Sequence, residues 1–441
     1  MAYIYPFRAW RYNPASVRLD DVVTQPYDKI SPAMQQAYYQ RSPYNLVRII
    51  LGLPELFDAE RHESVYTRAA HDFRAWREQG VLIRDNLPCV FAYSQRFQVP
   101  GSEVIKERRG FIALGKLHDY AERVVFRHEQ TLSKPKSDRL NLLRATRAHF
   151  GQIFMLYSDP VASVERILFD GAGPADAEVT DEYDVLHRLW RVNDPASIRL
   201  LVTAMADKKL IIADGHHRYE TALNYAREHA PESQPRTESN FSHLPSPAYP
   251  EAAAMMTFVN MDSEGLVILP THRVVHSLTA FDQAGFRIRA SEFFEIHEIA
   301  DADDPAYLRQ LKQQQGPAFV AVFRDRAWLL RARPEAVGPV LEALPDRQRQ
   351  LDLTVLHSIV LDRLLGLDPE KIREQTNVRY LRDAGEAVEQ VRTGEADVAF
   401  LTNPVTIEQL REVAFAGEVM PQKSTDFYPK LLSGLAIYAL D

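Results

Sequence analysis

The sequence predicts a mixed α/β (α+β) protein with more than one domain. Its 441 residues exceed what one hydrophobic core usually serves, so we expect two or three domains. Segments of helical period alternate with segments of strand period along the chain. Several strand pairs flank turn-like segments, which is typical of hairpins, so mixed sheets are expected rather than a purely parallel one.

The N-terminal region, 1–120, is expected to hold a helix followed by a hairpin. Apolar residues recur three and four positions apart in 60–80, and Gly80 is a typical helix end. The runs 88–99 and 108–117 have strand character and flank a turn-like segment, which predicts an antiparallel pair.

The central region, 121–290, combines helices with buried strands. Its expected elements are, in order, a helix capped by Ser137 or Asp138, a strand at 152–160, a mostly helical span at 160–206, a strand at 210–213, a helix to about Glu228, a Pro- and Ser-rich loop at 229–251, and a hairpin of 255–261 with 266–270.

The C-terminal region, 291–441, is expected to form a further α+β domain. Its strands are a hairpin of 318–323 with 328–333, then 397–404 and 434–440.

Composition and charge restrict the classes of function. The formal net charge of −8 provides no general attraction for nucleic acid or anionic membranes, although a local basic patch would still bind DNA. Cys89 is the only cysteine, so an intrachain disulfide is excluded and a thiolate metal cluster is disfavoured. The chain starts with no signal-peptide pattern and has no membrane-spanning apolar run, so we expect a cytosolic protein without membrane or nucleic acid partners.

The segment IIADGHHRYETAL carries the strongest candidate site. A buried strand ends at Asp214, Gly215 permits a sharp turn, and a helix follows at once. A helix N-terminus offers free N–H groups and a positive dipole end to phosphate. Arg218 adds a bidentate contact, and His216 and His217 add donors.

Asp214 could hold magnesium or orient an imidazole. The simplest alternative for this segment is a solvated Asp-Gly turn, which would account for Asp214 and Gly215 but not for the three basic residues after them. A transition-metal site is weaker, because adjacent helical histidines diverge by about 100°. The sequence therefore favours a phosphate site.

A second candidate is RHEQTLSKPKSDR. Here Glu129, beside His128, is a potential base, and Lys134, Lys136 and Arg139 are cations. Together with a phosphate site this set suits phosphoryl transfer, in which a carboxylate accepts a hydroxyl proton and cations neutralise the moving charge. The alternative is a charged, solvated loop.

Two further candidates are polar segments that follow apolar runs. Lys423, Ser424 and Thr425 form a donor-rich loop, and His272 and Arg273 follow a strand. Each is equally well explained as a hydrogen-bonded loop; brought together, they would line one positive substrate pocket.

Several familiar catalytic motifs are incomplete or absent in this sequence. The segment from Gly110 to Lys116 has P-loop spacing, but Leu117 replaces the magnesium-binding hydroxyl residue and the inner residues have strand character. The segment RHEQT lacks the second histidine of a zinc protease, and no serine-hydrolase elbow is present.

The motifs FRAWRYNP, TQPYDKIS, SPYNLVRI, RHEQTLSKPKSDR, IADGHHRYETAL, MMTFVNM, LPTHRVV and GEVMPQKSTDFYPKLLSGL occur in this order. The sequence therefore resembles the bacterial and archaeal family called domain of unknown function 1015, from about residue 6 to the C-terminus. The resemblance identifies a family and implies little about activity.

More distantly, the His-Glu pair followed by a strand and Asp-Gly-His-His-Arg resembles the ParB/sulfiredoxin-like superfamily. The resemblance implies a ParB/sulfiredoxin-like core in 121–290 with additional N- and C-terminal α/β segments. Free-serine kinases of this superfamily phosphorylate the L-serine hydroxyl with ADP or ATP. By motif, Glu129 becomes the base and Asp214–Arg218 the phosphate turn. The 85 positions between Glu129 and Asp214 exceed the spacing in the compact kinases. The assignment of both roles by motif therefore requires 160–206 to be an insertion.

The first functional hypothesis is a phosphotransferase, a small-molecule kinase that acts on a hydroxylated metabolite such as serine. Its donor would be ADP, ATP or pyrophosphate with Mg²⁺, and Lys134, Lys136 and Lys423 would neutralise charge. The alternatives are a non-catalytic, nucleotide-responsive ParB-like regulatory protein, and a phosphatase or metabolite-binding protein with the same phosphate turn. DNA partitioning is disfavoured by the acidic charge and by the lack of a helix-turn-helix pattern.

Overall fold

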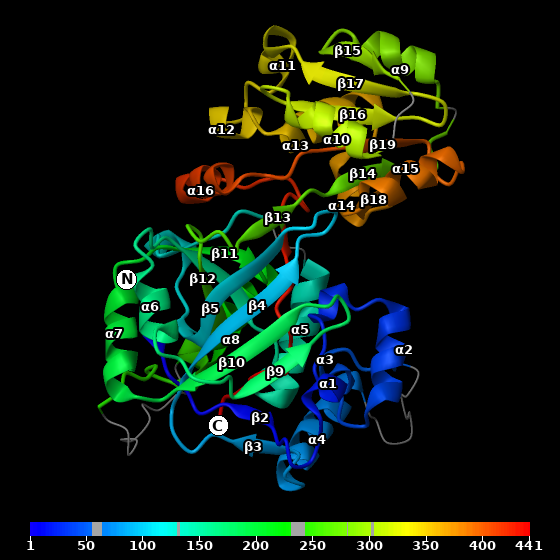
Figure 1. Ribbon diagram of the computed structural model, residues 1–441. Coiled ribbons are helices and arrows are strands. Elements are labelled where there is room, and N and C mark those ends of the chain that lie inside the picture. Colours follow the sequence, from blue (N-terminus) through cyan, green and yellow to red (C-terminus); the bar gives the residue numbers. More distant parts are fainter. Residues whose placement is uncertain (55–63, 130–132, 231–242, 280, 301–303) are drawn as a thin grey trace. The chain divides into compact units, whose positions relative to one another are not determined.

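The computed structural model confirms a mixed α/β protein (Figure 1). It describes the 441 residues except 55–63, 130–132, 231–242, 280 and 301–303. The chain folds into two compact units. Unit 1 comprises 1–127, 131–267 and 429–441, and unit 2 comprises 128–130 and 268–428.

Unit 1 is built on a nine-stranded mixed sheet. Eight strands follow the order β6-β11-β8-β12-β5-β4-β10-β9, and β1 pairs with Leu114 and Gly115 of β5, on the edge of β5 opposite to β12. These strands are β1 (Ile4–Tyr5), β4 (Val90–Gln98), β5 (Ile105–Lys116), β6 (Val125–Phe126), β8 (Ile153–Tyr157), β9 (Ala177–Thr180), β10 (Leu186–Val192), β11 (Leu210–Asp214) and β12 (Ala253–Asn260). Every residue of β8 and β12 is buried, as expected for central strands.

Three helices share one hydrophobic core with this sheet. They are α6 (Ser163–Phe169), α7 (Pro195–Met205) and α8 (His216–His229), of which α6 and α7 lie side by side in Figure 1. Tyr219 of α8 and Met155 of β8 are both fully buried in this core. The core therefore fixes α8 at the end of β11.

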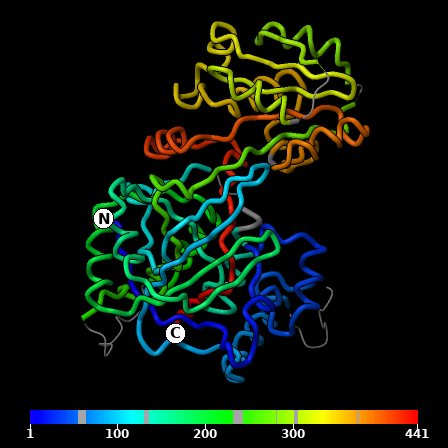
Figure 2. Tube along the Cα trace, in the orientation of Figure 1, coloured from blue at the N-terminus to red at the C-terminus, as the bar shows by residue number. Residues whose placement is uncertain are grey.

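A second core in unit 1 joins the N-terminal helices to the C-terminal segment, whose course Figure 2 draws in red. Trp10 bridges Ile437, and β21 pairs with β7. The remaining elements of this unit are β2 (Trp10–Tyr12), α1 (Leu19–Val22), η1 (Tyr27–Lys29), α2 (Pro32–Arg41), α3 (Val47–Ile50), α4 (Val65–Glu78), β3 (Leu82–Arg84), η3 (Tyr120–Glu122), α5 (Ser133–Thr146), β7 (Ala148–His149), η4 (Pro250–Ala252) and β21 (Tyr438–Ala439).

Unit 2 holds a six-stranded antiparallel sheet of order β15-β17-β16-β19-β14-β18. Its elements are β14 (His272–Val275), α9 (Gln283–Ala290), β15 (Phe294–Ile299), α10 (Asp304–Lys312), β16 (Ala318–Val322), β17 (Ala327–Ala332), α11 (Pro334–Val340), α12 (Asp346–Arg349), α13 (Asp352–Val355), the π-helix η5 (Leu356–Leu364), α14 (Pro369–Glu374), β18 (Val378–Leu381), α15 (Ala384–Arg392), β19 (Val398–Leu401), α16 (Ile407–Ala416) and β20 (Asp426–Tyr428). The short strand β13 (Val267–Leu269) pairs with β20.

Many expected elements are confirmed. These are the helix that ends before Gly80, the β4–β5 and β16–β17 hairpins, the strands β8, β11 and β19, and the helix α8. The predicted three-region division stays a prediction, although strands from its first two regions share one sheet. Most of the loop predicted at 229–251 lies outside the described residues.

Three expectations were wrong. The span 160–206 contains β9 and β10 between its two helices, and β10 extends the central sheet by pairing with β4. The predicted hairpin of 255–261 with 266–270 does not form, because β12 is already bounded by β8 and β5. Helix α5 begins at Ser133, so Ser137 and Asp138 lie inside it rather than at its cap.

The P-loop spacing at 110–116 has a packing explanation. Gly110 lies within β5, and a Cβ there would collide with the carbonyl oxygen of Phe258 on β12. A Cβ at Gly115 would likewise collide with Met256. These glycines therefore allow β5 and β12 to approach closely.

In the described parts of the chain, no helix combines the length and apolar character needed to cross a membrane.

Candidate functional site

The Asp-Gly-His-His-Arg turn joins β11 to α8 in unit 1. Gly215 adopts φ +94°, a left-handed conformation that residues with a Cβ rarely adopt. A Cβ there would also lie 3.0 Å from Nε of Arg218, so the arginine side chain folds back over the glycine. The first N–H groups of α8 have no partner within the helix itself, as at any helix start. The turn thus combines a helix N-terminus with a cation above it.

Asp214 is surrounded by positive charge. Its Oδ2 accepts a hydrogen bond from Lys430 Nζ at 3.1 Å, and its Oδ1 accepts one from Arg218 Nη2 at 3.3 Å. Burial alone would raise the pKa of Asp214, but Lys430, Arg218 and Lys29 hold it well below its usual range. Three cations therefore act on one carboxylate, which leaves the turn with an excess of positive charge.

Arg218 is fixed by the neighbouring strand. Its Nη1 donates to the carbonyl oxygen of Gln152, just before β8. The side-chain amide of Gln152 in turn donates to the carbonyl oxygen of Leu432 at 3.1 Å. The arginine and the C-terminal segment are therefore held by the same residue.

A cavity of about 70 Å³ lies against the turn in unit 1. Its lining includes Tyr27, Arg139, Gly151, Arg218 and Thr221. The guanidinium carbon of Arg139 lies 4.0 Å from the ring centroid of Tyr27, a cation–π contact. The volume suits a few water molecules or one small anion, and two of the lining residues are arginines.

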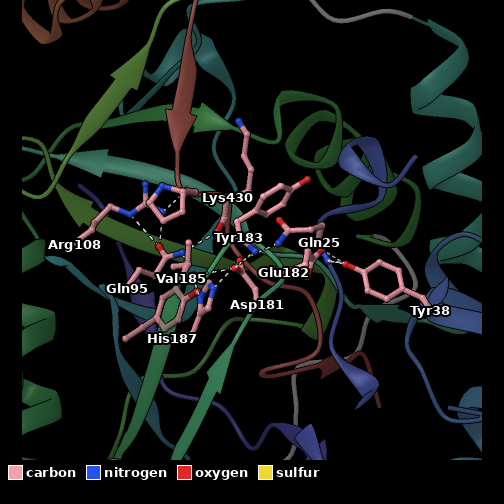
Figure 3. Close-up of polar contacts among 12 residues, drawn as sticks. Gln25, Tyr38, Gln95, Arg108, Asp181, Glu182, Tyr183, Val185, His187 and Lys430 are labelled. Atoms are coloured by element: carbon pink, nitrogen blue, oxygen red, sulfur yellow. Dashed lines mark hydrogen bonds and ion pairs between the residues drawn. The ribbon is translucent and has the colours of Figure 1, made fainter. Parts of the chain in front are cut away.

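A buried polar network holds the backbone on both sides of Lys430 (Figure 3). Arg108 of β5 donates to Gln95 of β4 at 3.0 Å and to the carbonyl oxygen of Pro429 at 2.5 Å. Gln95 donates to the carbonyl oxygen of Lys430 at 2.8 Å. Because Arg108 and Gln95 are each only 1% exposed, these contacts are shielded from water and hold the backbone from which Lys430 reaches Asp214.

The same network continues to the other edge of the site (Figure 3). His187 Nε2 donates to Asp181 at 3.1 Å, which leaves Nδ1 to accept from the hydroxyl of Tyr93 at 2.6 Å. Gln25 Nε2 donates to the same carboxylate at 3.0 Å. Burial lowers the pKa of His187, although Asp181 opposes this shift, so the ring is neutral at pH 7.

Unit 2 brings together several of the other predicted residues. His128, which is fully buried, has Nε2 2.8 Å from the hydroxyl of Thr425, and its carbonyl oxygen accepts from Met420 N at 2.8 Å. Arg273 donates from Nη2 to the carbonyl oxygen of Lys423 at 3.2 Å. The His-Glu motif and the Lys-Ser-Thr loop therefore meet within unit 2.

Arg273 is the charged centre of this second cluster. Burial lowers its pKa to about 10, while Tyr380 and Glu129 favour its charged form. Its Nε lies 3.2 Å from Nε2 of His357, and its guanidinium carbon lies 5.2 Å from the ring centroid of Tyr380. Glu129 is thus within electrostatic range of a buried arginine.

The remaining predicted residues have other contacts. Lys136 pairs with Glu220 at 3.0 Å, and the side chain of Lys134 lies outside the described residues. His216 is buried, and His217 is partly exposed. His272 Nδ1 accepts from Thr402 N at 3.2 Å, burial lowers its pKa to about 4, and Ser424 donates to the carbonyl oxygen of Pro421 at 2.5 Å.

Glu129 belongs to unit 2 and Asp214 to unit 1. A functional pairing of these two carboxylates stays a prediction, as do the assigned roles of the other site residues.

Several residues at the turn were not predicted as site residues. Lys430 lies 216 positions from Asp214, and Arg108 and Gln95 stand among other polar residues of β5 and β4, where no pattern distinguishes them. Two of the motifs contain such residues but were not used for the turn: TQPYDKIS supplies Gln25, Tyr27 and Lys29, and GEVMPQKSTDFYPKLLSGL supplies Lys430.

Among the described residues, those around Asp214 do not form a magnesium site held by protein ligands alone. Both oxygens of Asp214 are bonded to cations, which a metal ion would have to displace. Within the described ranges, no group of three or more histidine, cysteine, aspartate or glutamate residues is arranged to hold a metal.

Solved structures similar to this chain share little sequence with it. A conserved hypothetical protein from Pyrococcus furiosus is 14% identical, with 71% of this chain and 91% of that chain covered and a TM-score of 0.35. A free serine kinase in complex with AMP is 15% identical, with 71% and 89% covered and a TM-score of 0.36. SbnI with a C-terminal truncation from Staphylococcus aureus is 11% identical, with 73% and 85% covered and a TM-score of 0.35.

No curated protein matches the chain. The family described as Protein of unknown function (DUF1015) matches residues 4–354, and the segment GEVMPQKSTDFYPKLLSGL lies beyond this match. Because the match spans most of the sequence, the chain belongs to the DUF1015 family.

Proposed function

We propose that the chain is a phosphotransferase that transfers a phosphoryl group to the hydroxyl of a small metabolite. The observation that carries the proposal is the charge at the start of α8, where Arg218, Lys430 and Lys29 act on the single carboxylate of Asp214. A helix N-terminus with excess cations is suited to phosphate binding. The side chains of Arg218 and Asp214 are 15% and 21% exposed, which leaves them within reach of a ligand.

The resemblance of the Asp-Gly-His-His-Arg turn to that of free-serine kinases supports ADP or ATP as the donor and serine or a related alcohol as the acceptor. It also supports a ParB/sulfiredoxin-like core around β11 and α8. Pyrophosphate remains an alternative donor with the same chemistry. Magnesium would enter with the donor and neutralise part of its charge, as is usual in phosphoryl transfer.

In this proposal the turn in unit 1 and the cluster around Glu129 in unit 2 have different roles. The turn at Asp214–Arg218 binds the donor phosphates. Glu129 accepts the proton of the acceptor hydroxyl while the hydroxyl oxygen forms a bond to the transferred phosphorus and the donor's bridging oxygen leaves with its electron pair. Lys423, Lys134 and Lys136 are the first candidates for charge neutralisation.

The proposal is tested by thermal unfolding of the protein with ADP, ATP, CTP and pyrophosphate, each with magnesium. A ligand at one hundred times its Kd adds about 2.7 kcal/mol to the free energy of unfolding. We expect ADP or ATP to raise Tm by several degrees. If none of the four changes Tm, the turn is a solvated structural corner and the proposal fails.

Glu129→Gln is expected to reduce turnover by a factor of about 10² to 10⁴ while nucleotide binding is retained, because the amide cannot accept the proton. Transfer from the bound donor to L-serine and to other small alcohols measures this effect. Glu389→Gln, on the exposed side of α15, is the matched control. Wild-type turnover in the Glu129 variant would remove that residue from the mechanism.

The second candidate is a non-catalytic, nucleotide-responsive regulatory protein. The pairing of Lys430 and Arg218 with Asp214 favours anion binding but does not by itself require transfer. This candidate predicts nucleotide binding without consumption, and no effect of Glu129→Gln on binding or on the bound nucleotide.

A further inference from the structure

Unit 2 contains a cavity of about 310 Å³ that has no part in the proposed transfer. It is bounded by α13 with the π-helix η5, by the segment Val419–Gln422, and by residues around α12 and α14. None of the residues assigned above to donor binding or proton transfer lines it. Its volume falls within the range of small-molecule sites.

Several polar side chains that line this cavity have no hydrogen-bond partner among the described residues. Gln348, Ser358 and Gln422 line it, and their side chains make no hydrogen bond to other described residues. Thr354 also lines it, is only 4% exposed, and its buried hydroxyl lacks a partner among the described residues. Buried polar groups are normally hydrogen-bonded, so an unpartnered hydroxyl in a cavity wall points to a ligand or an ordered water.

His357 adds a directed donor to the wall. Arg273 Nε lies 3.2 Å from His357 Nε2 and has only a hydrogen to offer, so Nε2 accepts. Nδ1 therefore carries the proton of the neutral ring, and it has no partner among the described residues. Burial and then Arg273 keep the pKa of His357 well below its usual value, which maintains this neutral form.

The π-helix gives the wall its arrangement. The residues Leu356–Leu364 form η5, and Leu365 N bonds to the carbonyl oxygen of Val360, five residues earlier, at 2.9 Å. This i→i−5 pattern is rare and is frequent at functional sites. It presents His357, Ser358 and Asp362 to the same cavity.

The segment Val419–Gln422, which forms another part of the wall, is held in place by hydrogen bonds from its backbone. Met420 N donates to the carbonyl oxygen of His128 at 2.8 Å, and the carbonyl oxygen of Gln422 accepts from Arg273 at 3.3 Å. A wall that is fixed in this way loses little freedom when a ligand binds.

We propose that this cavity binds a small polyhydroxylated metabolite that is uncharged or carries an amine. Hydroxyl groups match the amide and hydroxyl groups of the wall, each of which can donate or accept, and they can accept from Nδ1 of His357. Asp362 is the only ionised group among the described lining residues, so an amine is favoured and a carboxylate is disfavoured. The inference goes beyond the proposed function, and its test uses no phosphoryl transfer.

The test is titration calorimetry of the full chain with glucose, glucosamine and glucuronate, three probes of one size and different charge. We expect glucosamine to bind best, glucose less well and glucuronate most weakly. Absence of binding by all three would overturn the proposal. Tightest binding by glucuronate would overturn it as well.

Variants locate the binding. Thr354→Val keeps the side-chain shape. It is expected to weaken the binding of those probes that bind the wild type about three- to tenfold, since one hydrogen bond is lost. Asp362→Asn, at an exposed position, should weaken glucosamine alone by about two- to fivefold. Glu389→Gln is the control and should change nothing. If both Thr354→Val and Asp362→Asn bind like the wild type, the ligand lies elsewhere and the assignment to this cavity is wrong.

Discussion

Replacing Arg218 by alanine is expected to weaken the binding of ADP and ATP about a hundredfold or more. The guanidinium already lies over the start of α8 and bonds to Asp214 and to the carbonyl oxygen of Gln152. A phosphate at this helix start would receive charge-assisted bonds from it, each worth about 1.5–3 kcal/mol. Loss of two such bonds accounts for the expected factor.

Thermal unfolding with and without nucleotide measures the change, with each variant compared to its own ligand-free state. At a nucleotide concentration that gives the wild type about 2.7 kcal/mol of added stability, a hundredfold weaker variant gains only about 0.4 kcal/mol. Arg227→Ala, at the exposed end of the same helix, is the control for loss of an arginine from α8.

Arg218→Lys separates charge from geometry. Lysine keeps one positive charge but cannot bond to Asp214 and Gln152 as a planar fork. We expect intermediate nucleotide binding from this variant, and it serves in place of alanine where alanine prevents folding. Equal nucleotide binding by wild type, Arg218→Ala and Arg218→Lys would show that the turn does not hold the phosphates.

The local parts of the fold could be predicted from the sequence. The β4–β5 hairpin and the strand–turn–helix at Gly215 are contiguous in the chain, so residue period and turn chemistry suffice to identify them. Strand β10 was missed because it mixes a half-buried and an exposed arginine with only two buried residues, His187 and Leu189. Such a pattern resembles a polar helix until its partner β4 is known.

The partner of a strand is decided by the whole sheet and not by its neighbour in sequence. Strand β12 looked like half of a hairpin, yet β8 and β5 occupy both of its edges. Contacts between residues far apart in the sequence are equally hard to predict at the site. The turn at Asp214 is a local motif, whereas Lys430 reaches it through a C-terminal segment held by Arg108 and Gln95, and no local pattern encodes that contact.

Replacing Asp352 by asparagine is expected to stabilise unit 2 above about pH 7. Asp352 lies at the start of α13, and its Oδ1 accepts from Ala318 N at 3.3 Å. Burial raises its pKa from 3.8 to about 7. The folded state therefore holds a proton that the unfolded state releases between about pH 4 and pH 7, so the free energy of unfolding falls as pH rises through this range.

Asparagine keeps the shape and the acceptor without the charge, so it should remove this pH-dependent loss. The gain in the free energy of unfolding should be up to roughly 4 kcal/mol at about pH 8 and close to zero at about pH 4, because a shift of one pKa unit corresponds to about 1.4 kcal/mol. Urea unfolding of both proteins across this pH range measures it. Asp207→Asn, at a side chain that is 84% exposed, is the control. A gain of equal size at both pH values would mean that packing or hydrogen bonding, and not the buried charge, separates the two proteins.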